Sequence, residues 1–246
     1  MTATKRIAAL TARHLKEIAR EPVSLAFLYG MPVIMEVLFY FLFSQQTDQF
    51  RMEYLAPAMI GFANAFLSLF LGLLLALDRC SAFMSRLFTT EVRPAEFILS
   101  YGLSVLPLGV SQSVVIFLVA GIIDPSFWNV GLLYALLASL VSCLFFTAVG
   151  LFLGTACNEK AVGGVASIVI TGQSILSAMW FPVEGMSQGF MTFLTILPFR
   201  NVALLVQNVF YPATFDSIGK PLLILFAYTI GFFMIAILIF KKKMRE

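Results

Sequence analysis

The sequence predicts an all-α integral membrane protein with six transmembrane helices, on the basis of its composition, its apolar run lengths and its charge distribution. Of the 246 residues, 60% are hydrophobic and 12% are charged, whereas about 25% of residues are charged in an ordinary soluble domain. A transmembrane helix needs roughly 20 predominantly apolar residues. Six such stretches occur, at residues 23–44, 55–77, 97–122, 130–154, 161–180 and 221–240.

The basic residues between these stretches are sorted by side, and this sorting predicts the orientation. Thirteen of the 16 Lys and Arg residues lie in the N-terminal segment, after the second and fourth stretches, or in the C-terminal tail; the other three are Arg51, Arg200 and Lys220. Because basic loops stay in the cytoplasm, both termini are expected on the cytoplasmic side of the cell (inner or plasma) membrane. The net charge is +3, and we expect the basic residues beside the apolar stretches to contact anionic lipid headgroups. We expect no nucleic-acid partner.

Residues 1–22 are predicted to form an amphipathic interface helix that lies on the membrane surface. Apolar residues recur every three to five positions, and basic residues cover the remaining surface. The apolar set is Ile7, Leu10, Leu15 and Ile18, and the basic set is Lys5, Arg6, Arg13, Lys16 and Arg20. The helix ends at Glu21-Pro22, because a residue before proline avoids the helical conformation. His14 borders the apolar face, either as a residue at headgroup level or as a pH sensor.

Residues 78–94 follow the second apolar stretch and mix charged with apolar side chains. Phe83, Met84, Leu87 and Phe88 are spaced so that they form one face of a short helix. A short amphipathic helix of this kind either lies flat on lipid or docks into a groove of a partner protein. The residues alone leave both interpretations open.

Two patterns of small residues predict close approach between helices. Gly150 and Gly154 are four residues apart in the fourth stretch. The fifth stretch carries a stripe that either packs against another helix or lines a polar path. The stripe consists of Gly163, Ser167, Thr171, Ser174 and Ala178.

Residues 181–212 are predicted to form an extracytoplasmic re-entrant helical hairpin between the fifth and sixth transmembrane helices. Two apolar runs occur here, and each is too short to cross a bilayer. Pro182 and Pro198 flank the first run, and Pro212 follows the second. We expect two half-helices that enter from outside and turn near Pro198, shielded from lipid by protein or water.

Four polar residues within the apolar stretches are candidates for a substrate pathway: Glu36, Asn64, Gln112 and Gln173. Glu36 is the single acidic residue within these stretches, where a carboxylate costs on the order of 2.5–3.5 kcal/mol. In one interpretation Glu36 faces a cavity or a partner and takes part in transport. Otherwise it is a protonated, hydrogen-bonded side chain or a side chain close to the wet interface.

The motifs of common enzymes are missing from the sequence. It contains no G-x-x-x-x-G-K-[ST] phosphate loop, no H-E-x-x-H and no G-x-S-x-G. The single His and the three Cys residues, which lack C-x-x-C spacing, predict no metal site. We therefore expect neither catalysis nor a bound cofactor on this chain.

Seven short motifs follow one another in a characteristic order. They are Arg20-Glu21-Pro22, Met31-Pro32, Asp78-Arg79, Arg86-Leu87-Phe88, Val92-Arg93-Pro94, Phe181-Pro182-Val183-Glu184-Gly185-Met186 and Pro198-Phe199. This arrangement resembles the membrane subunit of ABC-2 type (type V fold) ABC transporters, especially bacterial drug-export permeases. The chain departs from that pattern at Arg79-Cys80-Ser81-Ala82, where family members often have an acidic or Arg-Glu-rich run before Gly-Thr. It departs again at Ser187, where they often have proline.

The resemblance implies one transmembrane domain over residues 1–246, which works as the permease subunit of an ATP-driven transporter. Residues 78–94 would contain a coupling helix that docks into a cytoplasmic ABC ATPase, and ATP with Mg²⁺ would bind to that partner. The candidate coupling residues are Arg79, Phe83, Arg86, Leu87 and Phe88. A second permease copy, identical or homologous, would complete the transporter.

The expected activity is export of a hydrophobic or amphipathic small molecule, a drug or a lipid-like substrate. The alternative from another class is an ATP-independent channel or ion-coupled carrier, which usually shows several intramembrane ionisable residues or an internal repeat. A membrane anchor without transport activity is a third interpretation.

Overall fold

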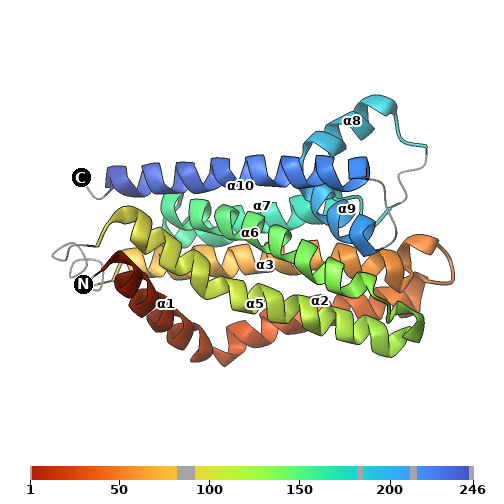
Figure 1. The fold of residues 1–246 in the computed structure, drawn as a ribbon, viewed down its shortest axis with the longest axis horizontal. Helices are drawn as coiled ribbons and strands as arrows, with labels where there is room; N and C mark the ends of the chain where they lie inside the picture. Colours follow the sequence, from red (N-terminus) through yellow and green to blue (C-terminus); the bar gives the residue numbers. More distant parts are fainter. Residues whose placement is uncertain (1, 82–91, 182–184, 211–214, 244–246) are drawn as a thin grey trace.

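The computed structural model describes residues 2–81, 92–181, 185–210 and 215–243, and every regular element in these ranges is a helix (Figure 1). Two short 3₁₀ turns, η1 (Asp48–Phe50) and η2 (Pro125–Phe127), join longer elements. The α-helices are α1 (Ala3–Ala19), α2 (Pro22–Phe43), α3 (Met52–Arg79), α5 (Pro94–Ile123), α6 (Gly131–Ala156), α7 (Glu159–Leu176), α8 (Gln188–Ile196), α9 (Pro198–Phe210) and α10 (Phe215–Lys243).

Among the described residues, five helices are long and apolar enough to cross a membrane: α2, α3, α5, α6 and α10. The pair α8 and α9 meets the same requirements together, but the two helices are bent by 82°, as in a broken span or a re-entrant loop. The bend falls within residues 181–212, where the sequence predicts a hairpin. The predicted all-helical membrane fold is therefore confirmed.

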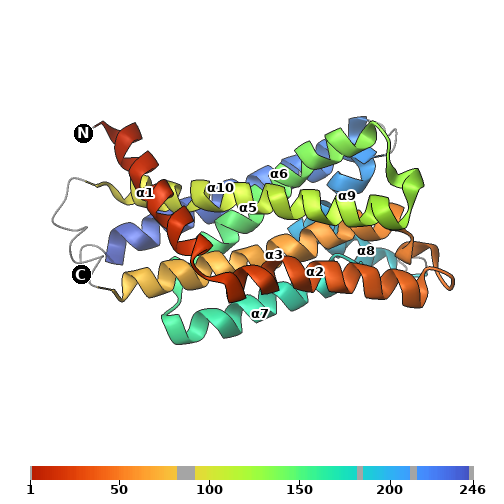
Figure 2. The same ribbon diagram turned by 90° about the horizontal axis from the view of Figure 1, so that it is seen from below.

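The helix predicted at 161–180 is α7, which is not one of the five. It has 18 residues, which corresponds to about 27 Å at 1.5 Å per residue. Its glycines, hydroxyl side chains and Gln173 make it less apolar than its neighbours. It lies along α3 (Figure 2). Two residues of its small-residue stripe, Ser167 and Thr171, are exposed, so this face is open in the described chain.

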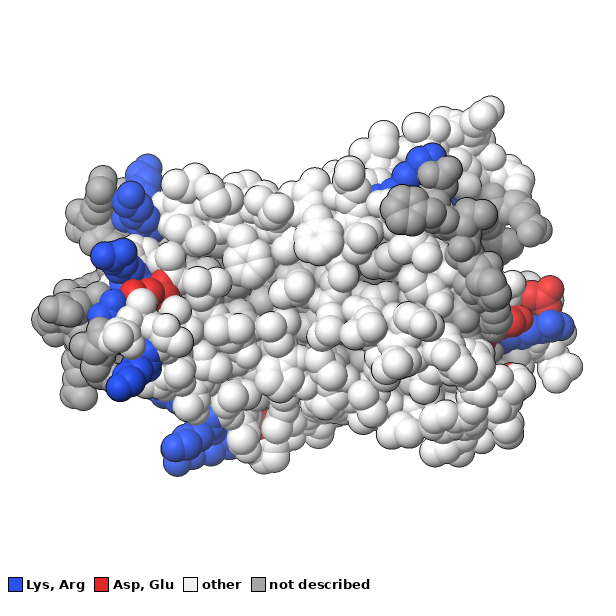
Figure 3. Space-filling model, in the orientation of Figure 1, with Lys and Arg blue, Asp and Glu red and all other residues white. Residues whose placement is uncertain are grey.

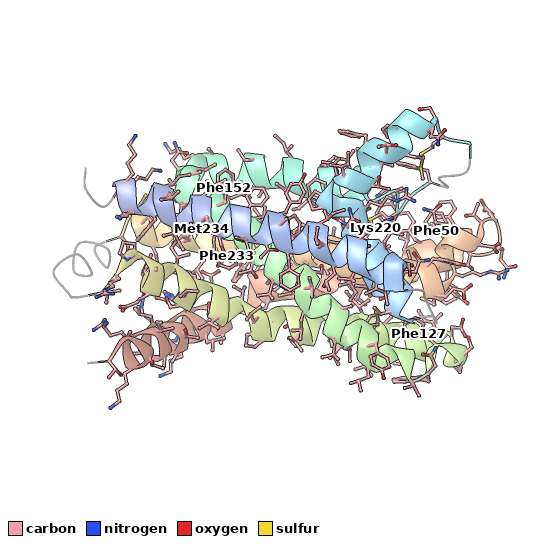
Figure 4. All side chains as sticks on the ribbon, turned by 45° about the horizontal axis from the view of Figure 1, so that its top comes forward. Phe50, Phe127, Phe152, Lys220, Phe233 and Met234 are labelled. Carbon is pink, nitrogen blue, oxygen red and sulfur yellow. The ribbon has the colours of Figure 1, made fainter. Side chains whose placement is uncertain are left out.

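The long helices lie roughly along the long axis of the bundle with alternating chain direction, and both termini lie at the same end, opposite the α8–α9 pair (Figures 1 and 2). Lys and Arg gather around the end with the termini, and the middle of the surface carries almost no charge (Figure 3). Figure 4 places Phe50 and Phe127 at the opposite end, where both side chains are buried. These features fit a bundle with two polar ends and an apolar belt between them.

Helix α3 forms the centre of the bundle and packs against α2, α5, α6, α7 and α9. In α3 and α6, 67% of the most apolar stretch is buried, compared with 17% in α2 and α10. Close approach between α3 and α6 depends on glycine. A β-carbon on Gly154 would lie 2.8 Å from the carbonyl oxygen of Gly72, closer than real β-carbons come. The predicted close packing at this position is confirmed.

Candidate coupling site and transport pathway

Helix α1 contacts the chain on both sides of the undescribed residues of the predicted coupling segment, residues 78–94. Arg6 on α1 donates from Nε and Nη2 to the two carboxylate oxygens of Glu96 on α5, at 2.9 and 2.7 Å. This paired geometry is the stronger form of an Arg–carboxylate contact. Arg13, two turns further along α1, lies 3.4 Å from the carboxylate of Asp78 on α3. Helix α1 therefore bridges the helices that precede and follow the segment.

Four of the five predicted coupling residues, Phe83, Arg86, Leu87 and Phe88, lie outside the described residues. The fifth, Arg79, ends α3 and turns toward α6. Its Nη1 donates to the carbonyl oxygens of Gly154, Thr155 and Cys157, at 2.6, 2.7 and 3.2 Å.

A positively charged donor stabilises these carbonyl oxygens because they lie at the C-terminal end of α6. The last carbonyls of a helix lack partners within the helix and carry partial negative charge. Lys243 of α10 donates to the same turn, at 2.8 Å from the carbonyl oxygen of Thr155. Arg79 and Lys243 thus join the ends of α3, α6 and α10 beside the coupling segment. A contact between Arg79 and an ATPase stays a prediction.

His14 lies in the packed junction between α1 and α5, where protein covers its side chain completely. Its side chain is fully buried, and its ring stacks on Tyr101 with 3.7 Å between the centroids. Burial lowers the pKa of His14 to about 4; the charge of Arg13 adds to this effect and Asp78 opposes it. The imidazole is therefore neutral at physiological pH.

The carboxylates near His14 come from two helices. Asp78 accepts a hydrogen bond from the hydroxyl of Tyr101, and Glu17 on α1 lies within 2.5 Å of Arg13. Burial raises the pKa of Glu17, and the charge of Asp78 adds to this rise. Sequence gives no sign of this cluster, because Asp78 and Tyr101 are far along the chain from His14 and Glu17. Their spacing carries no motif.

The four candidate pathway residues are all buried, and two of them join helices. Asn64 on α3 donates from Nδ2 to the hydroxyl of Ser142 on α6 at 3.0 Å. Gln112 on α5 donates from Nε2 to the carbonyl oxygen of Leu28 on α2 at 2.6 Å. These bonds connect neighbouring helices inside the apolar belt.

Glu36 and Gln173 differ from the other two. No described residue hydrogen-bonds the carboxylate oxygens of Glu36 or the amide of Gln173. Gln173 lies against Gly61 of the central helix, where a β-carbon would come within 2.4 Å of its Nε2. Because buried polar atoms are usually satisfied, these two side chains are the better candidates for binding something absent from a single chain.

A cavity of about 700 Å³ opens at the end that carries α8 and α9. Its lining includes the connection between α2 and α3, the segment after α7, and Arg200 and Gln207 of α9. Ala178 has a φ of 57°, a conformation that is unusual for a residue other than glycine, and its carbonyl oxygen accepts from Nε2 of Gln49 at 2.6 Å. The chain reversal at Ala178 brings the end of α7 to the mouth of the cavity. No pattern in the sequence predicts this cavity.

A search of curated proteins finds no match to the chain. The family model for the ABC-2 type transporter matches residues 5–211, from α1 into the segment that follows α9. Permeases of this kind are transmembrane, non-catalytic subunits. The match covers most of the chain, so this multi-pass membrane protein belongs to the ABC-2 type transporter family, as a permease subunit.

Proposed function

We propose that this chain is the permease of an ATP-driven exporter and that a separate ABC ATPase binds residues 78–94 at the cytoplasmic end. ABC-2 permeases pair with ABC ATPase subunits. The observation that carries the proposal for this segment is its attachment: α1 binds Asp78, its first residue, and Glu96, two residues beyond its last. A displacement of the segment would therefore move α1, α3 and α5 together.

Because α3 lies at the centre of the bundle, it can transmit such a displacement from the cytoplasmic end to the opposite end. This helix runs from Asp78 beside the segment to Met52 at the other end, and it is buried along most of its length. Rigid packed helices transmit a push as a body instead of absorbing it. Nucleotide would act through its different affinity for two arrangements of the ATPase pair. Two permease copies would face each other and switch access between the two sides.

The proposed substrate is hydrophobic or amphipathic, such as a drug or a lipid-like molecule. The middle of the face shown in Figure 3 carries almost no charge. The lining of the cavity at the far end includes amide and guanidinium groups. A molecule with an apolar body and a polar head matches both surfaces. The cavity would then serve as the exit vestibule.

Reconstitution tests the proposed function against the alternative of an ATP-independent channel or carrier. The chain would be placed in vesicles alone or with the ATPase that copurifies from native membranes, with ethidium and a fluorescently labelled phospholipid as probes. We expect movement of a probe only with the ATPase and ATP, and none with an ATPase variant that lacks its phosphate-loop lysine. Movement driven by the chain alone would contradict the proposal.

The cytoplasmic location of the coupling segment predicts the reactivity of Cys80. Cys80 is exposed, Cys143 is buried and Cys157 is partly buried. A membrane-impermeant maleimide should leave Cys80 unmodified in intact cells and should modify it in inverted vesicles. Cys80→Ser identifies the labelled residue. Labelling of Cys80 from outside intact cells would reverse the orientation and remove the proposed ATPase contact.

The pathway proposal predicts transport defects for two buried residues. Glu36→Gln removes an ionisable group, and Gln173→Ala removes an amide that has no described partner. We expect transport to fall about tenfold in each variant, as for loss of one buried polar contact, while ATPase copurification stays unchanged. Gln188→Ala, at an exposed position on α8, is the control. Transport at the wild-type rate in both variants would remove them from the pathway.

A further inference from the structure

The junction between α1 and α3 holds three groups of the kinds that bind metal ions. Nδ1 of His14 lies 3.5 Å from Oε2 of Glu17 and 3.9 Å from Oδ2 of Asp78. The three atoms all lie within 4.8 Å of one another. One imidazole and two carboxylates converge on a volume the size of a single ion.

Two of these atoms are buried without a hydrogen bond. Neither nitrogen of His14 has a partner in the described part of the chain, and the side chain has no exposed surface. Oε2 of Glu17, which faces Nδ1, is also buried without a described partner. Leaving a buried polar atom unsatisfied costs about 1–3 kcal/mol. Two such atoms that face each other indicate that something binds between them.

Two of the three candidate ligands already have other contacts: Arg13 lies against both carboxylates, and Oδ2 of Asp78 accepts from the hydroxyl of Tyr101. Arg13 contacts Oε1 of Glu17, the oxygen that does not face His14, at 2.5 Å, and its two Nη atoms each lie 3.4 Å from one oxygen of Asp78. The hydroxyl of Tyr101 donates to Asp78, and its ring stacks on the imidazole. Partners of this kind orient metal ligands in many sites.

We propose that His14, Glu17 and Asp78 bind one divalent transition-metal ion, with Zn²⁺ the best match to the ligand set. Ligand atoms at about 2.0–2.2 Å from a tetrahedral ion lie about 3.3–3.6 Å apart. The His14–Glu17 separation of 3.5 Å already fits, the His14–Asp78 separation of 3.9 Å needs to close by about 0.5 Å, and the third needs to close by at most about 1.5 Å. A nitrogen ligand favours zinc over magnesium or calcium, which prefer oxygen. The fourth position would hold water.

The position of the site gives the ion a structural effect. Asp78 lies four residues before the undescribed segment, and His14 and Glu17 lie on the helix that bridges both of its flanks. A bound ion would fasten α1 to α3 at this point. The inference does not depend on the proposed export activity, because the ligands and the test concern the chain alone.

Zinc binding can be measured on the full chain, purified in detergent without a polyhistidine tag. A Cys80→Ser background removes the exposed thiol, which could hold zinc by itself. The protein would be stripped with a chelator, incubated with ZnCl₂, separated from free metal by gel filtration and analysed by mass spectrometry. We expect about one zinc per chain, and less than a tenth of that in His14→Gln.

Two further variants separate a built site from surface binding. Glu17→Gln should raise the dissociation constant for zinc at least tenfold, measured by competition with a zinc-sensitive dye. Glu17 is about one-third exposed, so this variant keeps the test decisive if His14→Gln does not fold. Glu159→Gln, which removes an exposed carboxylate on α7, should bind zinc like the wild type.

Three outcomes would overturn the inference. The Cys80→Ser protein could retain no zinc, which would leave only a proton to satisfy His14 and Glu17. His14→Gln could retain as much zinc as the Cys80→Ser protein while eluting from gel filtration at the same volume, as a folded protein should. Glu159→Gln could lose as much affinity as Glu17→Gln, which would indicate nonspecific binding to surface carboxylates. Failure in any of these ways would leave the reconstitution experiment unaffected.

Discussion

Replacing Gly150 with valine is expected to prevent α6 from packing against the central helix. A β-carbon at this position would lie 2.7 Å from the carbonyl oxygen of Ser68 and 3.0 Å from its Cα. Both are backbone atoms of a buried helix, so no side chain can rotate out of the way. Overpacking a core costs typically 1–3 kcal/mol, out of a total stability of about 5–15 kcal/mol. We place Gly150→Val at or above the upper end of that range.

The measurement for Gly150→Val is the yield of monodisperse protein in detergent, together with its unfolding temperature. Gly231→Val is the matched control, because it places the same side chain in a long apolar helix where a β-carbon would have no described atom within 4 Å. The control should behave like the wild type. If both variants accumulate and melt alike, the close α3–α6 contact does not govern assembly.

Changing Phe83, Leu87 and Phe88 together to aspartate is expected to abolish copurification of the ATPase while leaving membrane insertion intact. These residues lie outside the described ranges, and their role as an apolar docking face is a proposal. Losing a central apolar anchor of an interface costs about 2 kcal/mol or more, so three losses should weaken binding at least a thousandfold. Affinity purification of the tagged permease from native membranes measures the retained ATPase.

The matched control for this experiment keeps the apolar face and changes only its shape. Phe83→Leu, Leu87→Met and Phe88→Leu, combined in one chain, should retain most of the ATPase. If the aspartate variant also retains it, the ATPase docks elsewhere, and α1 is then the next surface to examine.

Apolar run length predicts five of the six expected spanning helices, α7 being the exception, but it does not predict where helices end. The stretch predicted at 55–77 is α3, which extends from Met52 to Arg79, because a helix can continue past the apolar belt into polar surroundings. The opposite error occurs in α7, which ends at Leu176 although residues 177–180 are still mostly apolar. The chain reverses at Ala178, where glycine is the usual residue. An alanine gives no signal for such a turn.

The candidate site is less predictable, because its contacts join distant parts of the chain. Sequence identifies Asn64 and Gln112 as polar residues in apolar stretches, but it does not show that each already has a partner on a neighbouring helix. It likewise gives no sign that Tyr101 would cover His14. Periodicity describes one helix at a time. Pairing between helices depends on their rotation and tilt, which only the folded structure supplies.

The unequal burial of the helices has a consequence for how the protein should be handled. Helices α2 and α10 turn most of their surface outward, whereas α3 and α6 touch other helices along most of their length. Lipid therefore has more access to α2 and α10 than to α3 and α6. A bilayer of the wrong thickness would tilt α2 and α10 and strain their connections, while the inner pair would keep its geometry. Acyl-chain length in a nanodisc is consequently a variable to control before any loss of activity is assigned to a substitution.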